Sequence, residues 1–216
     1  MESFADRLQI TRGVTALIGG GGKTSLLYRL ADELRTRGSV IVTTSTHIWP
    51  PAHLPFAEHA DGVNDILCVG TPCDSGKLAA PAQSFSELAA LADFVLVEAD
   101  GSAGRPLKAH LPHEPVVPEN AGQVICVLGL SGFGKPIEIA AHRPERFAAL
   151  AGAVVEDAAT PEMAARVLNA EALHTRVLLN QADAPVRVEA AERLAALLHY
   201  DCVIASLQKG EILCSF

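Results

Sequence analysis

The part of the sequence most suited to chemistry is the run Gly19-Gly20-Gly21-Gly22-Lys23-Thr24-Ser25. It fits a shortened phosphate-binding loop, G-x-x-G-K-T, because the longer pattern G-x-x-x-x-G-K-[ST] would need glycine where Leu17 stands. Glycines let backbone N–H groups surround a phosphate, and a following helix adds its dipole. Lys23 would neutralise the β- and γ-phosphates of a nucleotide, and the Thr24 hydroxyl would hold Mg²⁺. The alternative is a glycine-rich turn with a solvated lysine.

Two acids lie at the end of the apolar run at residues 94–98. Glu98 is the last residue of the run, and Asp100 stands two residues later. A carboxylate at the end of a buried strand can hold Mg²⁺, directly or through water, or orient an attacking water. We therefore take Lys23, Glu98 and Asp100 as the candidate catalytic groups, and Thr24 and Glu98 as the candidate metal ligands. The alternative for these acids is a structural turn with the glycine that follows them.

The segment Asn180-Gln181-Ala182-Asp183 is similar to the N-K-x-D element of GTPases, with glutamine in place of lysine. In that element the aspartate accepts hydrogen bonds from guanine, and the asparagine fixes the base and the loop. Ser206 follows a later apolar run, where GTPases have their second base-contacting loop. Alternatively, Asp183 caps a helix that begins near Pro185. ATP and GTP both remain candidate ligands.

Further candidates lie on the loops after other apolar runs. Thr44 and Thr46 would complete Mg²⁺ coordination or touch the γ-phosphate, although threonine is also a common strand residue. Arg105 and Lys108 would stabilise charge that develops during phosphoryl transfer. Residues 129–135 match the longer glycine pattern, but the proline that follows has neither a hydroxyl nor an N–H. We predict that this segment is a mobile loop that covers a substrate.

Histidines and acids after residue 108 suggest a metal site, but a weak one. His110, His113 and Glu114 are interrupted by a proline, which argues against one shared helical face, and we expect loop histidines to be solvated. His142 and Arg143 instead suggest a site for an anionic substrate.

Short apolar runs alternate with helical patterns, which indicates an α/β protein. We expect strands at residues 14–18, 40–44, 66–69, 94–98, 123–129, 175–179 and 202–205, and helices at 24–37, 84–92, 144–151, 161–169 and 185–199. Nearly continuous apolar strands predict a mostly parallel sheet covered on both faces. We therefore predict a single domain over residues 1–216 with a P-loop NTPase-like three-layer fold, whose ligands bind at the carboxyl ends of the strands.

Composition limits the classes of function. The chain has 216 residues and a net charge of −8, which argues against a general binder of nucleic acid or membrane surfaces. No apolar run approaches the ~18 residues of a transmembrane helix. Glu2, Asp6 and Arg7 stand where a signal peptide would be apolar, so we expect a cytoplasmic protein. The cysteines are five and scattered, and Cys68 and Cys73 lack the second pair that a structural zinc site needs.

Several segments together resemble the YqeC family, whose members are described as accessory proteins of selenium-dependent molybdenum hydroxylases or as selenium cofactor biosynthesis proteins. The resemblance runs from about Val14 to Ser206 and is carried by IGGGGKTS, VTTSTHI, VEADGSAGRPLKAHLPHEPVVP, LGLSGFGKP with AAHRPE, and LLNQAD. It implies a P-loop NTPase fold and a role in maturation of those hydroxylases.

These observations lead to one hypothesis and two alternatives. The first is a Mg²⁺-dependent NTPase that binds ATP or GTP and assists maturation of the selenium- and molybdenum-containing cofactor, with the hydroxylase or its cofactor-assembly proteins as partners. A nucleotide-dependent transferase or ligase is the second, because shortened glycine loops also occur in ligases. The third is a nucleotide-gated delivery protein whose slow hydrolysis only times release.

Overall fold

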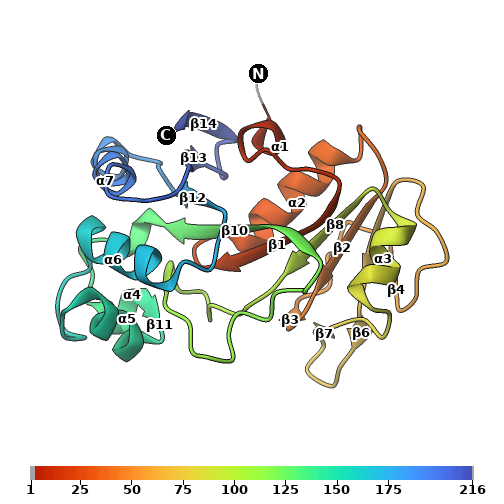
Figure 1. Ribbon diagram of the computed structural model, residues 1–216, viewed down its shortest axis with the longest axis horizontal. Coiled ribbons are helices and arrows are strands. Elements are labelled where there is room, and N and C mark those ends of the chain that lie inside the picture. The colour runs from red at the N-terminus through yellow and green to blue at the C-terminus, as the bar shows by residue number, and fades with distance from the viewer. Residues whose placement is uncertain (1–2, 216) are drawn as a thin grey trace. The chain divides into compact units, whose positions relative to one another are not determined.

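The computed structural model of the protein describes residues 3–215, whose elements are labelled in Figure 1. The fold consists of two compact units. Unit 1 contains the residues up to Ile18 together with Thr24–Gly101 and Val116–Val124. Unit 2 contains Gly19–Lys23, Ser102–Pro115 and the chain from Ile125 onward. Each unit is therefore assembled from segments that are distant in sequence.

Unit 1 is built on a parallel sheet with the strand order β1-β8-β2-β5-β4. A smaller antiparallel sheet has the order β3-β7-β6. The strands are β1 (Gly13–Gly19), β2 (Val40–Thr44), β3 (His47–Ile48), β4 (Phe56–Ala57), β5 (Ile66–Val69), β6 (Thr71–Pro72), β7 (Leu78–Ala79) and β8 (Phe94–Glu98). The helices are α1 (Phe4–Arg7), α2 (Lys23–Leu34) and α3 (Phe85–Leu91).

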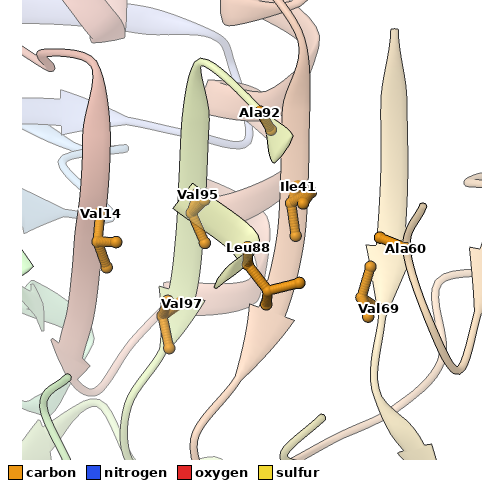
Figure 2. Packing of buried hydrophobic residues seen from close by; sticks show 8 residues of the cluster. All are labelled: Val14, Ile41, Ala60, Val69, Leu88, Ala92, Val95 and Val97. Atoms are coloured by element: carbon orange, nitrogen blue, oxygen red, sulfur yellow. The ribbon is translucent and has the colours of Figure 1, made fainter. Parts of the chain in front are cut away.

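The core of unit 1 forms where α3 packs on the sheet. Strands β2 and β8 are buried along their whole length, as expected for parallel strands with both faces covered. Ser84 and Glu87 form a capping box that begins α3 and so orients the helix. Figure 2 shows the resulting cluster, in which Leu88 of α3 lies over apolar side chains of the sheet; its members are Val14, Ile41, Ala60, Val69, Leu88, Ala92, Val95 and Val97.

Unit 2 contains a second set of parallel strands in the order β10-β12-β13, with β14 antiparallel to β13. A short parallel pair joins β9 to β11. The strands are β9 (Leu107–Lys108), β10 (Ala121–Gly129, in this unit from Ile125), β11 (Ala141–His142), β12 (Arg176–Asn180), β13 (Cys202–Ser206) and β14 (Glu211–Ser215). The helices are η1 (a 3₁₀ turn, Leu130–Gly132), α4 (Ile137–Ala140), α5 (Pro144–Ala151), α6 (Pro161–Glu171) and α7 (Pro185–Ala195).

The predicted α/β class with mostly parallel strands and flanking helices is confirmed. Three strands and one helix have the predicted bounds, namely β2, β5, β8 and α5. The region 45–65, predicted to be mostly loop, contains β3 and β4, and the helix predicted at 185–199 ends at Ala195. No helix among residues 3–215 is both long enough and apolar enough to cross a membrane. Cys68, Cys126 and Cys202 are free thiols inside the fold, consistent with small core residues.

Candidate functional site

The glycine loop joins the end of β1 to the start of α2 and packs closely against other parts of unit 2. A Cβ built on Gly21 would lie 2.4 Å from the Cα of the last residue of β10. One built on Gly22 would lie 2.4 Å from Nδ2 of Asn180. Both glycines also have positive φ, at 80° and 131°. The close packing of the loop against its neighbours therefore requires glycine at these positions even without a ligand. Evidence for a phosphate site must come from the groups around the loop.

Lys23 is buried, so the alternative of a solvated lysine is wrong. Its exposed fraction is 4 %, and its ammonium donates to the carbonyl oxygen of Gly19 at 2.6 Å. A buried ammonium is costly unless oxygen atoms satisfy it, and here the loop itself supplies one. The Gly20 N–H donates to the carbonyl of Val127 at 2.8 Å, so this amide is engaged within the fold.

Three elements of unit 1 bring hydroxyl and carboxylate oxygens together at the carboxyl end of the sheet. Thr24, on the first turn of α2, donates its hydroxyl to Oε2 of Glu98 at 2.9 Å. The sheet register places Thr44 beside Glu98, and the Thr44 hydroxyl donates to the Glu98 carbonyl at 2.8 Å. The Thr46 N–H in turn donates to the Thr44 hydroxyl at 2.9 Å. The fold therefore brings Thr24, Thr44 and Glu98 together.

The hydroxyl of Thr24 and the carboxylate of Glu98 fit a Mg²⁺ site in which the protein supplies only some of the ligands. Mg²⁺ is usually held by one or two protein carboxylates together with phosphate oxygens and water. Thr24 and Glu98 offer a hydroxyl and one carboxylate, and no group of three or more His, Cys, Asp or Glu side chains suited to a metal occurs among the described residues. Thr24 and Glu98 would therefore supply only part of the coordination of Mg²⁺ rather than a complete cage.

Two other predicted residues of unit 1 differ in their environments. Asp100, on the loop after β8, is buried with 1 % of its surface exposed. Ser25 lies exposed on the first turn of α2. Nearby, burial and the charge of Glu98 raise the pKa of Tyr28 to about 12, so its phenol stays protonated at neutral pH. Glu98 is itself 7 % exposed, so an added cation would interact strongly with its carboxylate.

Asn180 links the glycine loop to the loop after β13. It is the last residue of β12, and its Nδ2 donates to the carbonyl of Gly21 at 2.8 Å. Its Oδ1 accepts from the N–H of Leu207 at 3.0 Å. The side chain is 4 % exposed, so both bonds are sheltered from water. The predicted role of asparagine in fixing the loop therefore has a direct structural counterpart.

Asp183 faces the loop after β13 and does not cap a helix. Its Oδ1 accepts from the Ser206 hydroxyl at 2.5 Å, and its Oδ2 pairs with Arg187 at 3.3 Å. The N-cap of α7 is Ala184, and no side chain caps that helix, so the capping alternative is wrong. The ammonium of Lys209 donates to the Asp183 carbonyl at 3.1 Å. Sequence reasoning missed Arg187, although its position four residues after Asp183 on a helical segment was the available signal.

Gln181, which replaces the lysine of N-K-x-D, points to the loop after β10. Its backbone has φ of 71°, in the left-handed region that non-glycine residues seldom adopt. Its Oε1 accepts from the N–H of Ser131 at 3.3 Å. The glutamine therefore connects β12 to the 3₁₀ turn η1.

The cations predicted to stabilise transferred charge are held by protein groups within unit 2. Lys108 has a side chain only 1 % exposed, 3.3 Å from Glu114, and Arg143 is bonded to the same carboxylate. Burial raises the pKa of Glu114, but the Arg143 hydrogen bond and the Lys108 charge outweigh it and lower the pKa to about 2. Arg105 donates to the backbone carbonyl of Glu138. These contacts give structural roles to Arg105 and Lys108, and also to Arg143, which we predicted at a site for an anionic substrate.

His110 is buried, contrary to the prediction of a solvated loop histidine. Its exposed fraction is 5 %, and its Nδ1 lies 2.7 Å from Oε2 of Glu171 at the end of α6. The Glu171 carboxylate also accepts from the His110 N–H at 2.6 Å. His113, in contrast, has a side chain that is 72 % exposed. Only the tertiary contact with α6 distinguishes the two histidines.

Comparison with known proteins agrees with the resemblance found in the sequence. A family model described as "YqeC protein" matches residues 15–145, which include the glycine loop, Glu98 and Asp100 but not Asn180 or Asp183. A protein of Escherichia coli (strain K12) described as "Uncharacterized protein YqeC" is 36 % identical over 161 residues. This match covers 64 % of the present chain and 60 % of the relative's length. Because the family model matches more than half of the sequence, the chain belongs to the YqeC family.

Proposed function

We propose that this protein binds a nucleoside triphosphate together with Mg²⁺ and hydrolyses it. The observation that carries the proposal is the hydrogen bond of 2.9 Å between Thr24 and Glu98. Thr24 directly follows the buried Lys23 in the chain, so a hydroxyl–carboxylate pair suited to Mg²⁺ is joined covalently to the end of the glycine loop. In nucleotide-binding proteins, the phosphates and the ion occupy these two neighbouring positions.

The roles of the remaining groups follow from their chemistry. Bound Mg²⁺ would neutralise charge on the phosphates and orient them. Lys23 would exchange its carbonyl contact for a phosphate oxygen, which is a stronger partner for an ammonium than a neutral carbonyl. Glu98 would hold the ion with Thr24. Asp100 is the acid we assign to orienting the attacking water.

The base would lie against Asn180 and Asp183 in this proposal. Asn180 already fixes the loop through Gly21, and Asp183 presents a carboxylate beside Ser206. Both ATP and GTP are candidates. Guanine recognition would require the guanine N–H groups to displace Arg187 from the Asp183 carboxylate, whereas adenine has no corresponding pair of donors.

The cellular role that we propose is maturation of the selenium- and molybdenum-containing cofactor of selenium-dependent molybdenum hydroxylases. This part rests on the family resemblance alone. A nucleotide-dependent transferase is the second candidate, and it is favoured by a cavity of about 530 Å³ in unit 2 that offers space for another substrate. Hydrolysis accelerated by the apo-hydroxylase would support maturation, and a modified small-molecule product would support transfer.

The decisive experiment is calorimetric titration of the purified protein with ATP, GTP and CTP, each with and without Mg²⁺. We expect Mg²⁺-dependent binding of a nucleotide, and its loss in Lys23→Ala. Lys77→Ala is the matched control, because Lys77 lies over the Trp49 ring, 5.2 Å from its centroid, and has no assigned role in binding. Binding that is unchanged in Lys23→Ala would refute the phosphate site. If GTP is the ligand, Asp183→Asn should weaken GTP far more than ATP.

A further inference from the structure

Unit 2 contains a cavity that the glycine loop does not line. Its volume is about 530 Å³, within the range of sites for small organic ligands. Three segments form its walls: the chain from η1 to Lys135, the start of α6 with the residues before it, and one face of α7. Its lining includes charged side chains from two of these segments, namely Lys135 and, on α7, Arg187, Glu189 and Arg193.

The wall of this cavity is held in place by backbone hydrogen bonds. The Gly134 N–H donates to the carbonyl of Ala159 at 2.9 Å, and the Ala159 N–H donates to the carbonyl of Lys135 at 2.8 Å. A further antiparallel bridge joins Pro136 to Ala158. These bonds fix the base of the Lys135 side chain beside the cavity. The backbone of this wall is therefore fixed by the protein itself, which lowers the entropic cost of binding a ligand.

Cations predominate among the charged groups that line the cavity. The lining contains three cations, Lys135, Arg187 and Arg193, and one acid, Glu189. Arg187 and Arg193 each have an acidic partner outside the lining, Asp183 and Glu162 respectively. The Lys135 ammonium has no hydrogen bond or ion pair with any described residue. Lys135 is therefore the lining cation that is available to an anion.

Most of the remaining lining is apolar. Leu130, Phe133, three alanines, Pro161 and Val186 contribute carbon surface. Val186 is 70 % exposed, so its aliphatic side chain is accessible to an occupant of the cavity. An occupant would therefore combine an apolar body with an anionic group.

From these observations we propose that the cavity binds a small organic anion, with a ring or branched apolar body and one carboxylate, phosphate or sulfonate group. Lys135 binds the anionic group, and Val186, Ala190 and Phe133 contact the apolar body. The assignment uses residues of unit 2 only and does not depend on nucleotide binding. Arg187 also lines the cavity but is paired with Asp183, so the anionic group is assigned to Lys135 and not to Arg187.

The test uses two probes that share an aromatic body and differ in one sulfonate group. 8-Anilinonaphthalene-1-sulfonate carries a sulfonate on an aromatic body, and N-phenyl-1-naphthylamine is its neutral counterpart. We expect the sulfonate to bind the native protein with one-to-one stoichiometry, measured by fluorescence titration, and the neutral probe to bind more weakly. Lys135→Glu should weaken sulfonate binding at least about tenfold, the factor expected for losing a hydrogen bond to a charged group.

Three further variants locate the site. Ala190→Trp fills the cavity while keeping every cation, and it should abolish sulfonate binding. Arg146→Ala removes an exposed arginine from α5, outside the lining, and should leave binding unchanged. Lys23→Ala should also leave it unchanged, even if nucleotide binding is lost. If Ala190→Trp does not fold, the sulfonate affinity of Lys135→Glu alone still tests whether the probe binds in this cavity.

Several results would overturn the assignment. Equal binding of the two probes would show that charge is not recognised, and unchanged binding in Lys135→Glu would place the sulfonate elsewhere. Competitive displacement of the probe by ATP or GTP in the native protein would identify the cavity as part of the nucleotide site rather than a separate one. Absence of saturable sulfonate binding to the folded native protein would likewise refute it.

Discussion

Removing the side chain of Asn180 tests whether β12 holds the glycine loop in its shape. Asn180→Ala deletes one bond to the Gly21 carbonyl and one from the Leu207 N–H, at 2.8 Å and 3.0 Å. The asparagine is 4 % exposed, so water cannot readily replace either bond. A buried polar group left without a partner costs about 1–3 kcal/mol. We therefore expect the free energy of unfolding to fall by about 2–4 kcal/mol, allowing for partial relaxation.

The chain offers a matched control for this change. Asn169 also donates to a backbone carbonyl, that of Leu197 at 2.8 Å, and accepts from a backbone N–H, that of His199 at 3.1 Å. Its bonds are exposed, so Asn169→Ala should cost under about 1 kcal/mol because water can take their place. Urea denaturation followed by far-ultraviolet circular dichroism measures both variants under the same conditions. Equal losses in the two would refute the reasoning from burial.

The same variant separates loop positioning from base recognition. Asn180 holds the backbone of the glycine loop, which would contact the phosphates of any nucleotide. Asn180→Ala should therefore weaken Mg²⁺–ATP and Mg²⁺–GTP by similar factors in calorimetric titrations, measured at a temperature where the variant is folded. A loss confined to GTP would mean that Asn180 acts on the base and not through the loop.

Three further predictions follow from individual contacts. Thr24→Val should abolish Mg²⁺-dependent nucleotide binding, whereas Thr24→Ser should keep it, because only serine retains the hydroxyl that is bonded to Glu98. Equal affinities of the two variants in calorimetric titrations would contradict this. Arg187→Ala should raise GTP affinity up to about fivefold, since a partly exposed ion pair is worth about 0.2–1 kcal/mol and its loss frees Asp183; a weaker affinity would contradict this. Burial lowers the pKa of His174 from 6.5 to about 4, so the unfolded chain takes up a proton first as the pH falls. The free energy of unfolding should then drop by about 3 kcal/mol between pH 6.5 and 4, and urea titrations should show that His174→Phe reduces this dependence while the exposed control His113→Phe does not.

The sequence alone determined the main elements and the position of the glycine loop. The strands at 40–44, 66–69 and 94–98 are short apolar runs bounded by polar or turn residues, and their bounds agree with the structure. The helix at 144–151 starts with proline and ends before Gly152, which adopts the left-handed conformation. Local signals of this kind act within a few residues, so they can be recognised without knowledge of the fold.

Local sequence patterns did not predict the shortest strands or β14, the last strand of unit 2. Strands β3, β4, β6, β7, β9 and β11 have two residues each, which is too short to show a period of alternation. Strand β14 forms through antiparallel pairing with β13, and that pairing is a property of the assembled sheet. Such elements are set by what they pack against rather than by their own sequence.

Only the tertiary structure decided which of the candidate residues meet. Thr24 and Glu98 are separated by 74 residues, and Asn180 and Gly21 by 159, so no spacing rule could pair them. Asp183 had two local interpretations, and only its contact with Ser206 on another strand end excludes helix capping. A parallel sheet collects the carboxyl ends of distant strands at one edge, so residue types were readable from the sequence while their partners depended on strand order.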